Sequence, residues 1–357
     1  MRRLRRLYKD IRSNIFAVPG RLIASAFILA LFIVPLILQD AYLLRMITLA
    51  NIFAIFAASW DVLSGFTRQV NLGHAAFFGI SAYVAALINL RLHLEPLFCI
   101  AVGSVGAVLM GLVVGFPALR LRGIYLSLTT LAFPVILNGI VVALADITGG
   151  ELGLYGVAPL LKSNISLYYV SLVLMVASAL AMWKLTDAKS SIVRTGIRFL
   201  AIGEDEIAAR SAGINTPRYK LLAFCVSAFF AGLAGGIYVH AIRVAGPSMF
   251  DLFFSFQPVI WTIFGGIGTI GGAITGVYVL YPLSEVLRMT PEIRMIVFAF
   301  LVAIVLLFMP EGIVTWLRDR VLEEECPRCK IVNSKRRTFC RGCGAPLRLS
   351  QAEMSQS

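Results

Sequence analysis

Residues 97–119, LFCIAVGSVGAVLMGLVVGFPAL, form one uninterrupted apolar run without a charged side chain. At about 1.5 Å per residue, a helix over this stretch crosses the roughly 30 Å hydrocarbon core of a bilayer. A helix is the expected form because lipid offers no partner for an unpaired backbone amide. The stretch therefore predicts a transmembrane span.

Runs of this kind recur along the whole chain, in which 59% of the 357 residues are apolar and 14% are charged. Soluble domains do not show this balance. We predict an all-α polytopic membrane protein with about ten transmembrane helices. The number falls to eight or nine if the third span, which opens with Asn71, Gly73 and His74, does not form or if the Gly-rich segment 265–276 forms a broken or re-entrant helix in place of two spans. The ten expected spans are Leu22–Leu38, Leu43–Leu63, Gly73–Leu90, Leu97–Leu119, Ile124–Leu144, Leu167–Leu185, Leu221–Ile242, Leu252–Ile267, Ile270–Leu287 and Ile293–Phe308.

Basic residues indicate the orientation of these spans. Residues 1–21 hold seven Lys or Arg against one Asp and lack a signal-peptide cleavage site, so we expect a cytoplasmic N-terminus. Six crossings then place the polar loop 194–220 in the cytoplasm, and four more place the C-terminus there as well. The basic segment is expected to attract anionic membrane lipid, and nucleic acid is not an expected partner. The residues that run against this orientation are Arg91, Lys162, Arg243, Arg288 and Arg294.

The polar loop 194–220 interrupts the apolar pattern and contains a short helical signal. Three acidic residues, 204–206, precede an Ala-rich stretch that ends at Gly213. Acidic residues favour the start of a helix and glycine its end, so we predict a helix over 204–212. Small side chains such as Ala208 and Ala209 let another backbone approach closely, which favours a docking element. The alternative is a solvated surface helix without a function.

The translocation path has four candidate residues: Asn71, Gly73, His74 and Phe133. A broken helix exposes backbone groups, which membranes tolerate only where the groups line a cavity or are buried by protein. Polar side chains at this depth should face the interior of the bundle. For His74, a hydrogen bond between two helices is an equally good interpretation.

The chain contains no G-x-x-x-x-G-K-[ST] motif, so it is not expected to bind ATP itself. The glycines of the segment 265–276 lie in an apolar run and lack a following lysine. Their four-residue spacing, as in Gly268 and Gly272, permits close helix crossing instead. Any ATPase would therefore be a separate protein.

Five segments, read in order, resemble the permease subunits of branched-chain amino acid ATP-binding cassette (ABC) importers, the LivH/LivM family, and within it the LivM branch. The similarity extends over about 22–312. The segments are WDVLSGFTRQVNLGHAAFFGISAYVAAL from Trp60, GFPALRLRGIYLSLTTLAFPVIL from Gly115, DITGGELGLYGV from Asp146, LLAFCVSAFFAGLAGGIYVH from Leu221 and FGGIGTIGGAITG from Phe264.

The resemblance implies a transporter subunit in a prokaryotic cell membrane, and not an enzyme. It also implies a second permease subunit, two ABC ATPase subunits and an extracytoplasmic substrate-binding protein as partners. The loop at Asp146 and Glu151 could meet that binding protein, or be a solvated turn. The implied substrates are leucine, isoleucine or valine, with urea and short amides left open. By position, the residues that would couple the chain to the ATPases are Glu204, Ala208, Ala209 and Gly213.

The C-terminal tail departs from this resemblance, because it carries two Cys-x-x-Cys pairs separated by ten residues: Cys326, Cys329, Cys340 and Cys343. This spacing predicts a zinc ribbon in which four thiolates hold one Zn²⁺ ion. So small a segment has no apolar core, and metal binding would supply its folding free energy. Disulfides are disfavoured in the reducing cytoplasm.

We therefore expect five regions along the chain. They are a basic N-terminus (1–21), a permease domain (22–310) with a coupling loop (186–220), a linker (311–325), the ribbon (326–347) and a tail (348–357). Two other classes of function remain as alternatives. One is a membrane-anchored regulatory protein that acts through the ribbon. The other, an intramembrane enzyme, is disfavoured because His74, His93 and His240 lack an assembled nucleophile and base.

Overall fold

The structure is a computed structural model that describes residues 19–37, 40–121, 123–187, 194–287 and 312–317. It also describes scattered residues between 296 and 347, which include 323–326, 328–329, 332–334, 340 and 343. The chain forms two compact units. The larger comprises residues 38–312, and the smaller comprises the two ends, 1–37 and 313–357.

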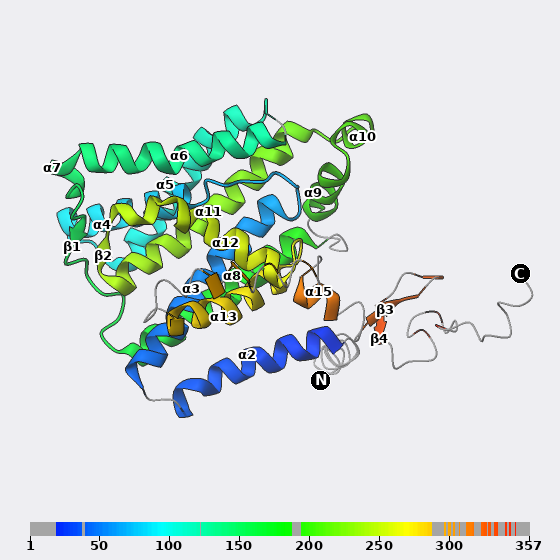
Figure 1. The fold of residues 1–357 in the computed structure, drawn as a ribbon, viewed down its shortest axis with the longest axis horizontal. Coiled ribbons are helices and arrows are strands. Elements are labelled where there is room, and N and C mark those ends of the chain that lie inside the picture. The colour runs from blue at the N-terminus through cyan, green and yellow to red at the C-terminus, as the bar shows by residue number, and fades with distance from the viewer. Residues whose placement is uncertain are drawn as a thin grey trace, which may run out of the picture. The chain divides into compact units, whose positions relative to one another are not determined.

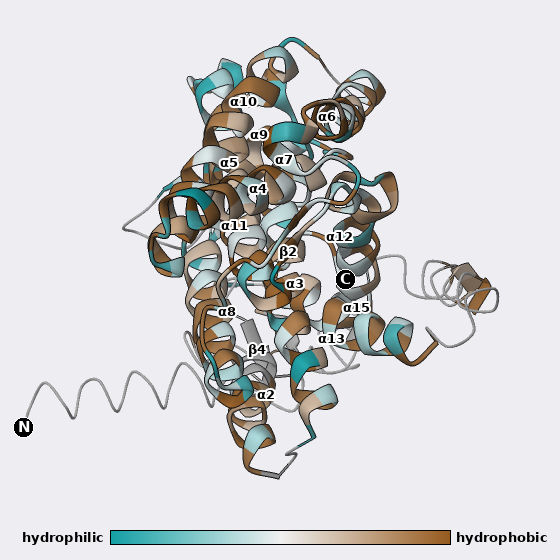
Figure 2. Cartoon of the chain, turned by 90° about the vertical axis from the view of Figure 1, so that its left-hand side faces the viewer, coloured by the Kyte–Doolittle hydropathy of each residue, from teal (hydrophilic) through white to brown (hydrophobic). Residues whose placement is uncertain are grey.

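Six helices of the larger unit are long and apolar enough to cross a membrane (Figure 1). They are α3 (Ala41–Ser64), α4 (Ala75–Leu92), α5 (Pro96–Ala118), α6 (Ile124–Ala143), α8 (Asn164–Thr186) and α11 (Thr216–Ile242). The shorter elements are α7 (Ala145–Thr148), β1 (Leu154–Tyr155), α9 (Thr195–Glu204), α10 (Glu206–Ser211), β2 (Val244–Ala245) and η1 (Pro247–Phe250). Strands β1 and β2 pair antiparallel. In Figure 2, brown hydrophobic residues recur on these helices among lighter and teal ones.

Two further apolar helices, α12 (Leu252–Gly265) and α13 (Ile270–Val286), meet at a bend of 109°. Neither is long enough to count as a span, and together they could form one broken span or a re-entrant loop. The turn between them depends on glycine, because Gly266 has φ +130° and Gly268 φ +73°. Side chains rarely adopt such backbone angles. The prediction of two separate spans here was wrong, and the broken-helix alternative is confirmed.

The predicted number of ten spans is therefore not confirmed: the described residues contain six, or seven with the bent pair. The predicted first span corresponds to α2 (Pro19–Ile37) of the smaller unit, whose apolar part, Ser25–Leu36, is shorter than a span. The predicted last span, Ile293–Phe308, lies mostly outside the described residues.

Helices α3 and α11 form the centre of the larger unit. Every residue of α3 from Ala50 to Ser64 is buried, and this helix packs against α8, α11, α12 and α13. Helix α11 packs against α3, α4 and α5, which its small residues allow: a Cβ on Gly235 would lie 2.1 Å from the carbonyl oxygen of Phe78. Helix α6 is largely exposed by comparison. In a membrane, lipid would cover the outer face of α6. The helices at the centre of the unit are those that other helices of the chain bury, α3 and α11.

The smaller unit contains α2, a short helix α15 (Ile313–Leu317) and the strands β3 (Glu323–Glu325) and β4 (Val332–Ser334). The two strands pair antiparallel, with Glu323 opposite Ser334 and Glu325 opposite Val332. Strand β3 leads directly into Cys326, so the hairpin delivers the first cysteine of the tail.

Candidate functional site

Helix α10 is defined by a side-chain cap at its start and a glycine after its end. The Asp205 carboxylate accepts hydrogen bonds from the backbone N–H groups of Ile207 (2.8 Å) and Ala208 (3.1 Å). After the helix, Gly213 has φ +84° and Ile214 N–H donates to the Ala209 carbonyl at 3.0 Å, which closes a Schellman turn. The predicted helix over 204–212 thus begins two residues later, because Asp205 serves as its N-cap.

A second helix, α9, precedes α10 and is fixed to the end of α8. Thr195 Oγ1 donates to the Leu185 carbonyl at 2.7 Å, and Gly196 lies so close to Thr186 that a Cβ there would be 2.4 Å from its carbonyl oxygen. The sequence prediction missed this helix. Its signal was the spacing of its buried residues, Gly196, Phe199 and Ile202, on one helical face.

An enclosed ion pair joins α10 to the first turns of α11. Glu206 Oε2 lies 2.6 Å from Lys220 Nζ, and Glu206 Oε1 lies 3.1 Å from Arg210 Nη2. The side chains of Lys220 and Glu206 are only 7% and 18% exposed. A cation so enclosed requires its partner, since a lone buried charge loses several kcal/mol of hydration.

The third attachment of the helix pair is to the loop after α3. Gly203 approaches this loop closely, because a Cβ there would lie 2.7 Å from the Phe66 carbonyl oxygen. Arg68 Nη2 and Glu204 Oε1 form an ion pair at 2.7 Å, with both side chains more than half exposed. Exposed pairs contribute little to stability, so the close backbone approach is the firmer attachment. Helices α9 and α10 therefore contact α8, the α3–α4 loop and α11 at one end of the unit (Figure 1).

The predicted coupling residues face different ways. Glu204, Ala208 and Gly213 are exposed, whereas Ala209 is buried at 5% exposure. Ile207, which the sequence analysis did not select, is 66% exposed beside Ala208. The exposed apolar residues of α10 are therefore Ile207 and Ala208 rather than a pair of alanines, and Arg210 and Ser211 are exposed beside them.

Three of the four candidate residues for the translocation path meet in a buried polar cluster. Asn71 and His74 are completely buried in the non-helical segment between α3 and α4. A hydrogen bond of 2.8 Å joins His74 Nε2 to Ser59 Oγ of α3, and Trp60 Nε1 donates to the Asn71 carbonyl at 2.6 Å. The Asn71 Oδ1 atom accepts from Gly73 N–H at 2.8 Å. The bonds to Ser59 and Trp60 attach the segment to α3, and the bond within the segment fixes its shape.

The same segment also contacts α6 and α12. A Cβ on Gly73 would lie 1.8 Å from the Thr130 carbonyl oxygen of α6, and Ala75 N–H donates to Ser255 Oγ of α12 at 3.2 Å. Phe133, the fourth candidate, is half-buried on α6, directly before Pro134. The cluster is thus a junction between helices with Phe133 on the neighbouring wall.

Asp61, which the sequence analysis did not select, joins α3 to the turn of the bent pair. It is completely buried, and its Oδ1 accepts from Gly268 N–H at 2.7 Å. Helix α3 continues into the loop that carries Arg68. The short segment 61–68 therefore contacts the α12–α13 turn through Asp61 and helix α9 through Arg68.

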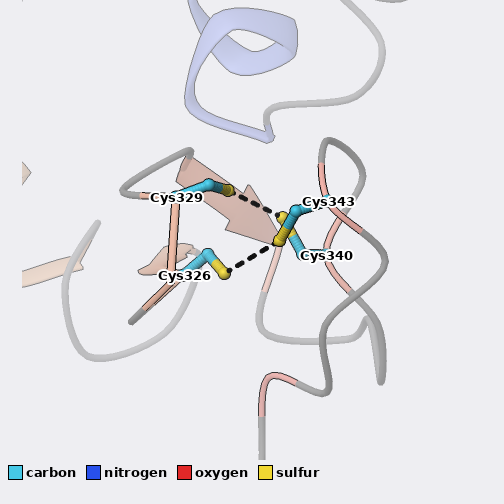
Figure 3. A group of neighbouring side chains, drawn as sticks. All are labelled: Cys326, Cys329, Cys340 and Cys343. Carbon is cyan, nitrogen blue, oxygen red and sulfur yellow. Dashed lines mark hydrogen bonds between the residues drawn. The ribbon is translucent and has the colours of Figure 1, made fainter.

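The four cysteines of the tail lie together, with their Sγ atoms all within 4.8 Å of one another (Figure 3). The Sγ atoms of Cys326 and Cys343 are 3.7 Å apart, and those of Cys329 and Cys340 are 3.4 Å apart. A disulfide requires about 2.05 Å, whereas four thiolates at about 2.3 Å from one zinc ion are roughly 3.8 Å apart. The grouping predicted from the spacing is confirmed, and it fits a metal ion.

Long apolar helices around a buried polar junction, with a firmly attached pair of helices at one end, define a multi-pass membrane protein. The chain belongs to the family described as branched-chain amino acid transport system permease component, whose family model matches residues 42–309. The four cysteines lie beyond this match. The tail is therefore an addition to the part that the family shares.

Curated relatives support the same assignment. The permease protein LivM of Escherichia coli K12 is 29% identical over 303 residues, which cover 77% of this chain and 70% of LivM. LivH of the same organism is 25% identical, with 75% and 92% covered. The autoinducer 2 import system permease LsrC of Enterobacter sp. 638 is 28% identical, with 74% and 78% covered. No solved structure gives a significant match.

Proposed function

We propose that the chain is a permease subunit of an ABC importer for branched-chain amino acids in a prokaryotic cell membrane. The observation that carries this proposal is the family match across 42–309, together with the names of the LivM and LivH relatives. The chain forms part of the translocation path and hydrolyses no ATP itself. Separate ATPase subunits would supply the energy, in keeping with the lack of a P-loop motif in the sequence.

In this proposal, α10 is the surface on which an ATPase subunit docks. Ile207 and Ala208 offer an exposed apolar contact, and Glu204 and Gly213 lie exposed at either side of it. Ala209 lies on the buried face of α10. Motion of the ATPase would then move α9 and α10 as one lever, because three attachments hold them to the membrane helices.

The attachments give this motion two routes into the bundle. The Glu206–Lys220 pair joins α10 to α11, which packs against α3, α4 and α5. The Arg68–Glu204 ion pair joins α9 to the α3–α4 loop, and the same loop contains the polar cluster of Asn71, Gly73 and His74. We propose that the substrate passes beside Phe133 of α6 and that the cluster sets the position of this wall.

The remaining partners follow from the same proposal. A second permease subunit of the LivH/LivM kind would complete the path, and two ATPases would dock from the cytoplasm. An extracytoplasmic substrate-binding protein would meet the loop at Asp146 and Glu151. Both chain termini and α10 are then cytoplasmic, as the basic N-terminus favours.

For the tail, we propose a structural zinc ribbon over 326–347, after a linker at 311–325. Four thiolates prefer zinc among the common structural metals, and Cys326 and Cys340 are buried. The ion would supply the cross-link that so small a segment needs in order to fold. In this arrangement β3 and β4 hold the first cysteine pair in place.

The function is tested by reconstitution in liposomes with a second permease, two ATPases and a binding protein. The expected result is uptake of labelled leucine that requires ATP and that excess isoleucine or valine inhibits. Urea, a short amide and autoinducer 2 serve as competitors. If one of these solutes is transported and leucine is not, the proposed substrate is wrong but the permease role stands. Uptake of no solute by a folded complex that hydrolyses ATP would contradict the permease role.

A further inference from the structure

A small cavity lies at the end of the bundle that is farthest along α8 from the coupling helices. It has a volume of about 180 Å³ and is formed where α3, α8 and α11 meet. Its lining includes Asn164, the first residue of α8, and Arg243, the residue after the end of α11. The opposite ends of these two helices contact α9 and α10. The cavity therefore lies at the end of these helices that is opposite to α9 and α10, where a bilayer crossed by α8 and α11 would have its headgroups.

The charge of this cavity is positive. Arg45 and Arg243 both line it, and none of its lining residues is acidic. Among the residues that the structure describes, Arg243 donates only its Nε–H, to the backbone carbonyl of Val157 at 3.2 Å. Within the described part of the chain, Arg45 makes no hydrogen bond or ion pair. Two guanidinium groups thus keep most of their donors available for a ligand.

The helix ends at the cavity do not neutralise this charge. The N-terminus of α8 carries a partial positive charge, and the side chain of its N-cap, Ser163, makes no capping hydrogen bond. The carbonyl end of α11 carries a partial negative charge of about half an elementary charge. Two full positive charges exceed it, so the cavity favours an anion.

The remaining lining suits a ligand with an apolar part. Thr48 and Asn164 add polar groups near the arginines, while Leu49 and Leu167 form apolar walls. The volume has room for a headgroup phosphate but not for a whole lipid. Acyl chains would have to leave the cavity past Leu49 and Leu167.

We propose that this cavity binds the phosphate of an anionic phospholipid, with Arg45 and Arg243 as its ligands. Guanidinium groups hold phosphate oxygens through paired, charge-assisted hydrogen bonds. Two arginines without an acidic neighbour favour phosphatidylglycerol, which has a net negative charge, over zwitterionic phosphatidylethanolamine. The site does not depend on which solute the protein transports.

The test is native mass spectrometry of the full chain in detergent, titrated with phosphatidylglycerol. Each basic group near a membrane surface contributes about 1 kcal/mol, so R45Q and R243Q should each weaken binding about fivefold and the double variant about 25-fold. The matched control is R91Q, because Arg91 is exposed, contacts the Ile147 carbonyl at 3.5 Å, and is not part of the cavity. It should bind the lipid as the unchanged chain does.

The other outcomes decide between lipid and soluble anions. Inorganic phosphate and glycerol phosphate are added as competitors, and neither should displace the lipid at equal concentration. If glycerol phosphate displaces it equally well, the ligand is a soluble anion and the lipid proposal is wrong. Equal lipid binding by the double variant and the unchanged chain also overturns it. Should the double variant unfold, R45K and R243K serve instead, with losses smaller than those of the glutamine variants.

Discussion

Lys220 Nζ of α11 lies 2.6 Å from Glu206 Oε2 of α10, and both side chains are largely enclosed. The ion pair that joins α9 to the α3–α4 loop, between Arg68 and Glu204, is more than half exposed on both sides. The two pairs have similar distances but different surroundings. Their contributions to stability should therefore differ, since water screens the second pair and not the first.

Replacing Glu206 by Gln should destabilise the protein by about 3 kcal/mol, because Lys220 would remain enclosed without a full counter-charge. Thermal unfolding in detergent, followed by size-exclusion chromatography, measures this change. Glu204→Gln is the matched control and should cost less than about 1 kcal/mol. Equal losses in the two variants would show that enclosure of the Glu206–Lys220 pair does not matter.

Arginine at Ile207 or Ala208 should reduce ATP-dependent uptake at least about tenfold without lowering the thermal stability, because both side chains are exposed on α10. Ala209→Arg should instead unfold the helix, since Ala209 is buried. The matched control is Ile197→Arg, at an exposed isoleucine of α9. Uptake that survives both α10 substitutions would contradict the docking role of this helix.

A methyl group at Gly73 should destabilise the junction between the α3–α4 segment and α6 by about 1–3 kcal/mol, the usual range for overpacking. The added Cβ would otherwise lie 1.8 Å from the Thr130 carbonyl oxygen. Gly139→Ala on α6 is the control, because nothing lies within 4 Å of a Cβ there. The melting temperature should fall for the first variant only. A matching fall for both would indicate a general effect of losing glycine.

The purified full chain should contain about one zinc per molecule, and Cys326→Ser with Cys340→Ser should remove it. Elemental analysis by plasma mass spectrometry measures the ratio. Cys225→Ser, at a cysteine in α11 outside the cluster, should leave the zinc content unchanged. A chain without zinc in the presence of all four thiolates would contradict the ribbon.

Deleting the residues after Val321 should leave leucine uptake within about twofold of the full chain, because the family match ends at residue 309. The same reconstituted uptake assay measures it. A membrane-anchored regulatory protein would behave differently: its activity would reside in the deleted part. Complete loss of uptake in a deletion variant that still folds would therefore favour an essential role for the ribbon.

The sequence was sufficient to predict the six long helices and the cysteine cluster. Each of these helices is a long apolar run, and lipid leaves such a run few other conformations. The cysteine cluster follows from a ligand spacing that few other structures require. These predictions rest on local patterns that the rest of the fold does not override.

The sequence was not sufficient where a tertiary contact decides the structure. Residues 252–267 and 270–287 have the composition of two spans, and their glycines also allowed a broken or re-entrant helix. The backbone at Gly266 and the Asp61 contact decide between the two in favour of the bent pair. Helix α10 has six residues, too few for a periodic pattern to tell exposed Ala208 from buried Ala209. The sequence did not show that Asp205 is the N-cap of α10, because it stands between two other acidic residues.

In the bent pair, backbone touches backbone. A Cβ on Gly265 would lie 1.9 Å from the Gly272 carbonyl oxygen, and one on Gly276 would lie 1.9 Å from that of Trp261. No side chain separates the two helices at these points, so even alanine has no room. In a survey of random variants, these glycines should be nearly invariant among functional survivors, whereas the outward face of α6 should accept almost any apolar residue. These contacts between α12 and α13 thus limit which sequences can evolve on this fold more strictly than the outward face of α6 does.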